Sequence, residues 1–196
     1  MRGVCRSIFV LLTVAWLLGC SSHEKTIVHT GKEISSDQKQ ALLRKKVAAL
    51  LEKKSYRRAV EVMSGGHQPG IPAAGMGKEY ISAINGLIAA GEEALARGDY
   101  AAAGHSFKWA AEDYPAESSL RQRIKWDPKQ LKKQLDICSN RLMEQGLMEY
   151  RRGNLEKAIQ KWKEIVAFDP GNMEAKKSLE TAEAQLKALQ KMDKHH

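Results

Sequence analysis

The side chains of this 196-residue chain that could carry covalent or metal chemistry are three cysteines and six histidines. Cys20 closely follows an apolar run, so its thiol is the first candidate for a covalent modification. Cys5 precedes that run, and Cys138 stands alone in the rest of the chain. A single remaining thiol has no partner for an internal disulfide. We therefore predict that Cys138 is a small buried hydrophobic residue rather than a reactive group.

The histidines do not have the spacing of a metal site. They stand at His23, His29, His67, His105, His195 and His196. The chain also has no glycine-rich phosphate loop, no Ser/His/Asp arrangement and no paired carboxylates in a loop. Its acidic residues are scattered among lysines along amphipathic segments, as on solvated helix faces. The sequence therefore predicts no catalytic residue, no metal and no cofactor, and we do not expect an enzyme.

The chain opens with the stretch "MRGVCRSIFVLLTVAWLLGCSS". Arg2 and Arg6 are followed by an apolar run at residues 8–18, which is too short to span about 30 Å of hydrocarbon. A positive start, a short apolar run and small residues after it are typical of a secretory signal. An uncleaved signal anchor and a soluble secreted protein remain the alternatives.

The letters "LLGC" that end at Cys20 resemble the lipobox of bacterial lipoproteins. The resemblance implies that residues 1–19 are a signal peptide, removed before Cys20, which then carries several acyl chains. At about 0.8 kcal/mol per buried CH₂ group, such chains form a stable membrane anchor. Ser21 stands where Asp retains a lipoprotein in the inner membrane of enterobacteria. For a Gram-negative source, the resemblance thus implies a lipid anchor on the periplasmic face of the cell outer membrane.

The formal charge of the chain is +9, and without Arg2 and Arg6 it is +7. In an exported protein, this excess does not indicate nucleic acid as the partner, so none is expected. Acidic proteins, anionic glycans, lipopolysaccharide phosphates and lipid headgroups are the available anionic partners. A solvated basic surface without any dedicated ligand is the simpler interpretation.

Residues 20–36 are polar and lack helical periodicity, so we expect a lipidated, flexible tether that spans about 20–25 Å on average. From residue 37 to 192, apolar residues recur at spacings of three and four, which predicts an all-α domain. Glycines, prolines and capping residues divide this domain into helices. The expected helices cover residues 37–51, 56–63, 76–97, 101–113, 128–151, 156–168 and 172–192. Residues 116–126 are expected to be irregular or to form one short helix.

Two 25-residue stretches of this domain share one sparse pattern. "GEEALARGDYAAAGHSFKWAAEDYP" ends at Pro115, and "GLMEYRRGNLEKAIQKWKEIVAFDP" ends at Pro170. Ungapped identities fall at Gly91/Gly146, Arg97/Arg152, Gly98/Gly153, Ala103/Ala158, Lys108/Lys163 and Pro115/Pro170, and Phe107 stands opposite Trp162. Each copy reads as helix, tight turn, helix and proline.

The shared letters match the physical needs of a helical hairpin. Gly91 and Gly146 would cost about 1 kcal/mol against alanine within a helix, a cost tolerated where a neighbouring group must approach closely. Gly98 and Gly153 supply the left-handed residue that ends the first helix. A hairpin cannot bury its own apolar face, so stacked copies would form one core and a curved groove.

The small residue, the aromatic and the proline at these intervals resemble the tetratricopeptide repeat (TPR) family. The resemblance implies units at residues 84–117 and 139–172, a degenerate unit at 40–72 and a polar capping helix at 173–192. It departs from the family because leucines replace the early tryptophan. The implied fold is all-α, a short tetratricopeptide-type helical-hairpin solenoid with a C-terminal capping helix. Since the units start 44 and 55 residues apart rather than 34, helices 76–97 and 128–151 are expected to be overlong and to protrude from one edge.

In this family the first helix of each unit lines the concave face, which implies a partner-binding groove. Its predicted residues are Arg44, Asn85, Ile88, Glu92, Asn140, Met143, Leu147 and Tyr150. The pair Asn85 and Asn140 is notable because a side-chain amide can bond a peptide backbone. Capping or solvent exposure is the alternative role for these asparagines, and the core is the alternative place for Met143 and Tyr150.

The expected function is a non-enzymatic, membrane-anchored periplasmic scaffold or adaptor that binds a protein partner for envelope complex assembly. Two alternatives remain open. One is a charge-driven binder of anionic cell-envelope glycan or lipid. The other is a self-assembling structural subunit that pairs through the helix beginning at Pro128, and the sequence leaves the oligomeric state undetermined.

Overall fold

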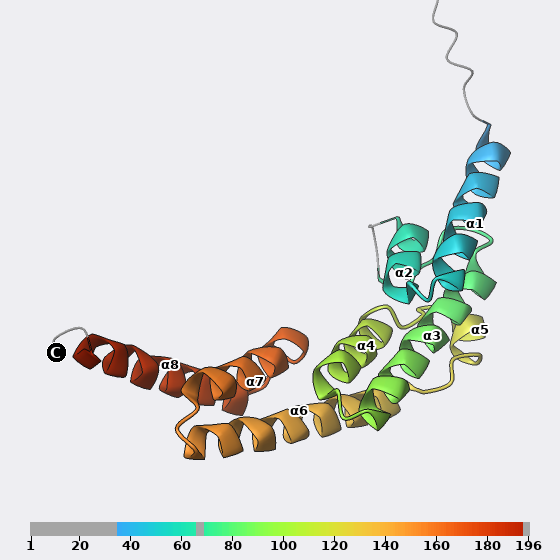
Figure 1. Cartoon of the computed structure of the whole chain (residues 1–196). Coiled ribbons are helices and arrows are strands. Elements are labelled where there is room, and N and C mark those ends of the chain that lie inside the picture. Colours follow the sequence, from blue (N-terminus) through green and yellow to red (C-terminus); the bar gives the residue numbers. More distant parts are fainter. Residues whose placement is uncertain (1–34, 66–68, 194–196) are drawn as a thin grey trace, which may run out of the picture. The chain divides into compact units, whose positions relative to one another are not determined.

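The computed structural model describes residues 35–65 and 69–193, and this part of the chain is helical without strands (Figure 1). The expected all-α class is thereby confirmed for these residues. The helices are α1 (Ser36–Glu52), α2 (Tyr56–Ser64), α3 (Gly77–Ala96), α4 (Tyr100–Glu112), α5 (Ser118–Arg121), α6 (Pro128–Arg151), α7 (Leu155–Phe168) and α8 (Met173–Asp193). The predicted signal peptide, Cys20, most of the tether, His67 and the two terminal histidines lie outside the described residues.

Side-chain caps mark the start of α1, α4, α6 and α8. At α6, the Asp127 side chain accepts a hydrogen bond from the Gln130 N–H at 2.8 Å, and Gln130 in turn accepts from the Asp127 N–H. With Pro128 in the first turn, this capping box confirms the predicted start. At α1, the capping box uses Ser35 and Gln38 instead of the expected Ser36 or Asp37.

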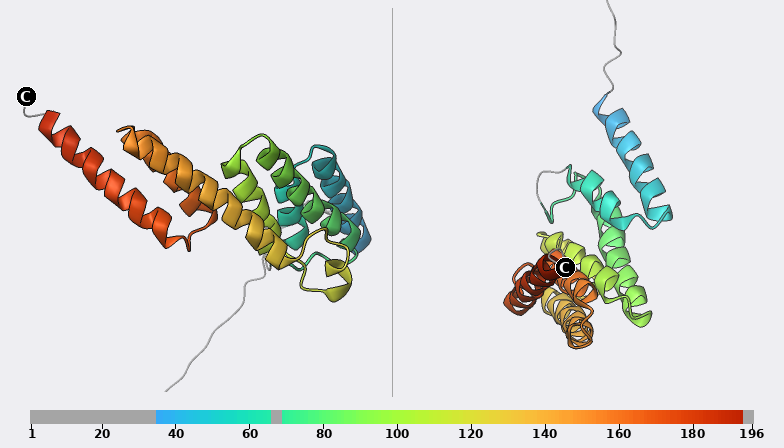
Figure 2. Two further views of the ribbon diagram at one scale, coloured as in Figure 1. Left: turned by 90° about the horizontal axis from the view of Figure 1, so that it is seen from below. Right: turned by 60° about the vertical axis from the view of Figure 1, so that its left-hand side comes forward.

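Two hairpins, α3–α4 and α6–α7, form the centre of the described domain (Figure 2). Gly98 and Gly153 end their first helices with φ angles of 74° and 77°, the left-handed conformation that glycine adopts without strain. This confirms the predicted turns. Helix α4 packs against α6, and α7 packs against α8, so the second helix of each hairpin contacts a long helix that follows it in the chain.

An aromatic ring lies directly on a mid-helix glycine in both hairpins. A Cβ atom added at Gly91 would lie 2.3 Å from the ring of Phe107. The equivalent atom at Gly146 would lie 2.4 Å from Nε1 of Trp162. The glycines therefore allow the close approach that the repeated pattern predicted, and any larger residue would force the helices apart.

The described domain contains a complete hydrophobic core. Its buried core residues lie between Val47 and Ala182, and every helix of the described chain contributes at least one. Cys138 belongs to this core and is 0% exposed, as predicted. Burial raises the pKa of its thiol to about 11, so the group is neutral at physiological pH.

The expectation that α3 and α6 protrude from one edge is wrong. Tyr80, in the first turn of α3, and Leu131, in the first turn of α6, are both 0% exposed. Loops that precede each helix account for this burial, because their side chains pack on the core. Leu120 and Trp126 come from one of these segments, and the Trp126 ring lies 5.5 Å from that of Phe107.

Helix α8 (Met173–Asp193) closely matches the range predicted for the last helix, and it buries little of its surface. Asn172 caps it by accepting a hydrogen bond from the Ala175 N–H at 3.0 Å. Only Ala175 and Ala182 are buried, and α8 packs against α7. Among the described residues, no helix is long and apolar enough to serve as a membrane span.

Candidate functional site

Three of the predicted groove residues line one pocket in the structure. Asn140, Met143 and Leu147 lie three and four residues apart on α6 and therefore on one face of that helix. The pocket has a volume of about 340 Å³. We call it the α6–α8 groove, and it is lined by Asn140, Met143, Glu144, Leu147, Trp162, Glu174 and Ser178. Three residues that the tetratricopeptide resemblance implied for the groove thus line one side of this pocket.

Trp162 of α7 supplies an aromatic surface to the α6–α8 groove. It is 3% exposed, and its Nε1 is buried without a hydrogen-bond partner in the described part of the chain. The ring is held between Gly146 and Tyr150, whose ring centroid lies 5.8 Å away. Tyr150 was predicted to line the groove, but it is half-buried against Trp162 and is not among the lining residues.

The rim of the α6–α8 groove is polar and partly acidic. Asn140 is exposed, and the Leu147 side chain is 41% exposed. Glu144 and Glu174 flank the groove from α6 and α8, and Glu144 also pairs with Arg141 at 3.1 Å. An amide, two apolar side chains and two carboxylates can together bind a peptide backbone, an apolar side chain and a cationic group.

Asn85 is the counterpart of Asn140 in the first hairpin, and its amide is occupied by its own chain. Its Nδ2 donates to the carbonyl oxygen of Arg123 at 3.0 Å, and its Oδ1 accepts from the N–H of Lys125 at 2.8 Å. Both polar atoms of the side chain thus bind one stretch of backbone. Asn85 is therefore not available to a partner.

The other predicted groove residues of the first hairpin are also unavailable. Ile88 is 0% exposed and belongs to the core. Glu92 forms an ion pair with Lys125, whose Nζ lies 2.5 and 2.6 Å from the two carboxylate oxygens. Residues 123–126 thus occupy the polar groups of Asn85 and Glu92, so the first half of the predicted groove is corrected to a surface that binds its own chain.

Arg44 lies apart from the α6–α8 groove. Its guanidinium donates to the carbonyl oxygen of Gly75 at 2.8 Å and lies 3.9 Å from Glu79. Gln40 donates to the neighbouring Ala74 carbonyl at 3.0 Å. Arg44 therefore ties α1 to the loop before α3, and its assignment to the groove is corrected.

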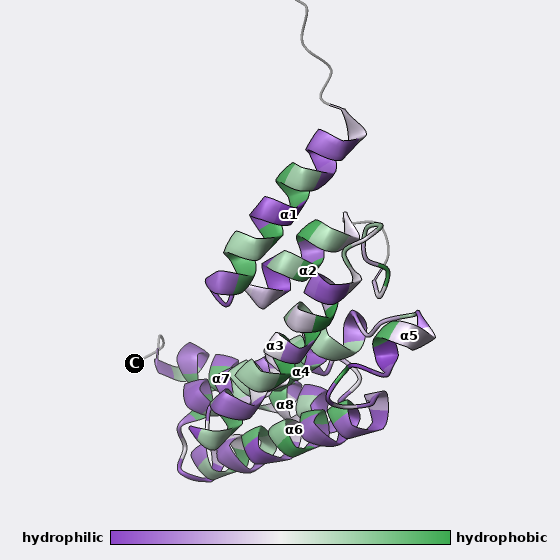
Figure 3. Ribbon diagram, turned by 90° about the vertical axis from the view of Figure 1, so that its right-hand side faces the viewer, coloured by the Kyte–Doolittle hydropathy of each residue, from purple (hydrophilic) through white to green (hydrophobic). Residues whose placement is uncertain are grey.

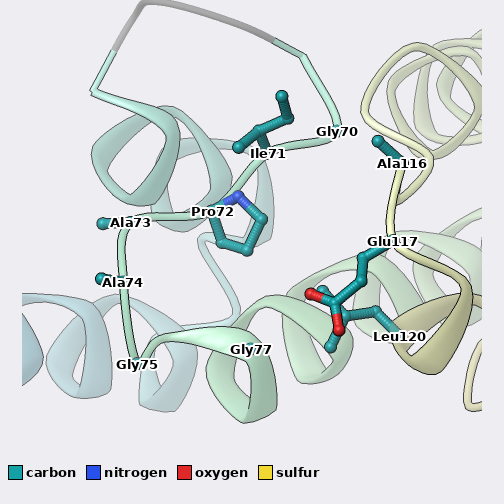
Figure 4. A pocket seen from close by; sticks show the side chains of 10 residues that line it. All are labelled: Gly70, Ile71, Pro72, Ala73, Ala74, Gly75, Gly77, Ala116, Glu117 and Leu120. Carbon is teal, nitrogen blue, oxygen red and sulfur yellow. The ribbon is translucent and has the colours of Figure 1, made fainter.

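A second pocket lies between residues 70–77 and 116–120 and has a volume of about 440 Å³ (Figure 4). Small and apolar side chains make up most of its lining, and Glu117 is the one charged residue among them. The Glu117 carboxylate accepts a hydrogen bond from Ser119. A lone exposed carboxylate offers no acid–base pair, so this pocket suggests no reaction.

The buried polar groups near this pocket have structural partners. The Tyr80 hydroxyl accepts from the Gly70 N–H at 3.2 Å and donates to the Asp113 carbonyl at 2.9 Å. Burial raises the pKa of Tyr80 to about 12. Asp113 is 5% exposed and pairs with Arg57, and its burial raises the pKa of its carboxyl against the opposing effect of the guanidinium. Each of these groups is used to join loops to helices.

Comparisons with known proteins give no family for this chain. No protein-family model matches it, and no curated protein or solved structure is significantly similar to it. Within residues 35–65 and 69–193, no group of His, Cys, Asp or Glu side chains is placed to hold a metal ion. The one histidine described, His105, packs against Trp109 and Phe168, and its burial lowers its pKa.

Sequence reasoning missed four residues of the α6–α8 groove. Trp162 was noted only as the counterpart of Phe107 in the repeated pattern, and Glu144 lies beside predicted positions on α6. Glu174 and Ser178 come from α8, which was predicted only as a cap. These two residues are four apart and therefore share one face of that helix, a spacing that could have indicated the second wall of the groove.

Proposed function

We propose that this chain is a non-enzymatic scaffold that binds a peptide segment of a protein partner in the α6–α8 groove. The observation that supports it most directly is the difference between two matched asparagines. Asn85 binds a backbone carbonyl and a backbone N–H of its own chain. Asn140 occupies the same position in the second copy of the pattern, and its side chain is exposed at the edge of a pocket.

The first hairpin also suggests what the groove would bind. There, residues 123–126 of the same chain bind Asn85 through their backbone, place an apolar residue in the core and pair Lys125 with Glu92. The α6–α8 groove likewise offers an amide, apolar side chains and two carboxylates. A partner segment with a free backbone edge, one or two apolar side chains and a basic residue fits these groups.

The proposed architecture is a short tetratricopeptide-type array with α8 as its cap. The glycine–aromatic contacts and the left-handed glycine turns of both hairpins support it. The degenerate unit is supported by Val47, Ala59 and Met63, which are at most 1% exposed. Arrays of this kind stack hairpins side by side and present grooves along one face.

The proposed cellular setting rests on the sequence before the described domain. Lipidation of Cys20 and a place on the periplasmic face of the outer membrane follow from the resemblance of "LLGC" to a lipobox and from Ser21. A scaffold held there would gather partners at the envelope because one end is fixed to the bilayer.

Photo-crosslinking in the native envelope tests the groove directly. A photoreactive amino acid replaces Asn140 in one variant and Gln160, an exposed residue of α7 outside the groove, in the control. We expect one dominant protein adduct from position 140 and little from position 160. Adding Leu147→Glu to the first variant should remove the adduct, with an unchanged circular dichroism spectrum.

Three results would overturn the proposal. Equal adducts from positions 140 and 160, or none from either, would mean that the groove has no dedicated partner. An adduct between two copies of this chain would instead support the self-assembling subunit. The long α6 helix would then become the element to vary.

A further inference from the structure

Helices α1 and α2 carry most of the excess positive charge of the chain. Between Ser35 and Gly65, eight lysines and arginines stand against three acidic residues, a net charge of +5. The chain from residue 66 to its end has a net charge of only +2. The charge is thus concentrated on the helices that directly follow residues 20–34.

One side of α1 combines unpaired lysines with an exposed leucine. Lys39, Leu42 and Lys46 recur at spacings of three and four residues, which places them on one face of the helix, and the C-cap residue Lys53 follows seven residues after Lys46. Leu42 is 63% exposed. The three lysines are exposed and have no ion-pair partner among the described residues, whereas Arg44 pairs with Glu79. We call this surface the α1 basic face.

The first half of α1 has few contacts with the rest of the domain. From Ser35 to Lys46, Leu43 is the one residue that is not exposed, and the first buried residue is Val47. Figure 3 shows hydrophilic and hydrophobic residues alternating along α1. A helix that is exposed in this way can lay one face on a flat surface without disturbing the core.

We infer that the α1 basic face docks onto a membrane surface that carries anionic phospholipid headgroups. Lysines at such a surface are attracted to lipid phosphates, and an exposed leucine between them can enter the interface. A glycan would match the lysines but would give Leu42 no apolar environment. A lipid surface satisfies both features of the face.

The sequence also favours a lipid surface as the occupant. Residues 21–34 separate Cys20 from Ser35, and a chain of this length reaches at most about 50 Å. If Cys20 is acylated, the α1 basic face therefore always remains near a bilayer. The inference does not depend on the α6–α8 groove, which lies on other helices, and it is tested without the acyl anchor.

Vesicle sedimentation tests the inference on the chain from Ser21 onward, which retains the complete core between Val47 and Ala182. The probes are vesicles of phosphatidylcholine alone and vesicles that also contain phosphatidylglycerol. We expect binding to the second kind only, with an affinity that falls as salt rises. Reversing Lys39, Lys46 and Lys53 to Glu should weaken binding roughly a hundredfold.

A matched control separates the α1 basic face from overall charge. Lys129, Lys157 and Lys187 are exposed on α6, α7 and α8, and their reversal to Glu gives the same net charge. This control should bind within about threefold of the wild type, because its lysines lie off the docking face. Leu42→Ala, which leaves the charge unchanged, should lose about three- to tenfold.

Three results would overturn the inference. Equal losses in the two triple variants would show attraction by net charge alone. Equal binding to both kinds of vesicle would show that headgroup charge has no part. Absent vesicle binding, together with salt-sensitive retention on an anionic glycan, would assign the α1 basic face to a glycan instead.

Discussion

The hairpins α3–α4 and α6–α7 share an internal contact and differ at their surface. In both, an aromatic ring lies on a mid-helix glycine, with Phe107 on Gly91 and Trp162 on Gly146. In the first hairpin, residues 123–126 cover the outer face of α3 and bind Asn85. In the second, the equivalent face of α6 borders an open groove.

The connecting segments explain this difference. A long segment, residues 113–127, joins the first hairpin to α6, and its side chains return to the core. Only residues 169–172 join the second hairpin to α8, which leaves no chain to cover Asn140. The internal contact is therefore a property of the repeated pattern, whereas the open groove depends on the length of the connection that follows each hairpin.

The largest effects should come from the shared internal contact. Alanine normally favours a helix over glycine by about 1 kcal/mol. At Gly91 and Gly146 its Cβ would collide with a buried ring, and such overpacking costs about 1–3 kcal/mol. We expect Gly91→Ala and Gly146→Ala each to lower the free energy of unfolding by about 1–2 kcal/mol in urea denaturation.

A double variant provides the control for this prediction. Phe107→Leu in the Gly91→Ala background makes room for the added methyl group. The double variant should therefore lose less free energy of unfolding than the sum of the losses of Gly91→Ala and Phe107→Leu alone. If either alanine variant is as stable as the wild type, the glycine–aromatic contact is not a close fit.

An intermediate effect should distinguish the two asparagines. Asn85→Ala leaves the Arg123 carbonyl and the Lys125 N–H without their partner, so we expect a loss of about 1–2 kcal/mol. Asn140→Ala removes an exposed side chain and should change stability by less than about 0.5 kcal/mol. Chemical denaturation of both variants measures this contrast, and equal losses would contradict it.

The smallest effect concerns the caps of α4 and α7. The Asp99 side chain accepts a hydrogen bond from the Ala102 N–H at 3.1 Å, so Asp99→Ala should cost about 1 kcal/mol. Asn154 makes no such cap bond and instead donates to Glu149 at 2.7 Å. Its replacement by Ala should cost at most about 0.5 kcal/mol. Thermal melts that reverse this order would show that the two turns are not capped as described.

The sequence predicted the helices well because their boundaries are set by local chemistry. The start of α6 at Pro128 and the turns at Gly98 and Gly153 follow from residues with strong positional preferences. The cap of α1 was placed one residue late, because tandem serines offer more than one candidate. Burial of Cys138 followed from its type alone.

The candidate site was predicted only in part. The resemblance to tetratricopeptide repeats implied a groove position for Asn140, Met143 and Leu147, and the structure places all three along one pocket. The same argument failed for Asn85 and Ile88, because the path of a loop across a helix leaves no periodic signal in the sequence. Arg44 was misplaced because the degenerate unit lacks the glycines that fix the geometry of the other two.

The most direct test of the central contrast is the solvent exchange of the Asn85 and Asn140 side-chain amides, measured by nuclear magnetic resonance on the chain from Ser21. We predict slow exchange for Asn85, whose Nδ2 is bound to the Arg123 carbonyl, and fast exchange for the exposed Asn140. Adding the partner identified by crosslinking should slow only Asn140. Equal exchange of the two amides in the free chain would contradict a covered first hairpin and an open second one.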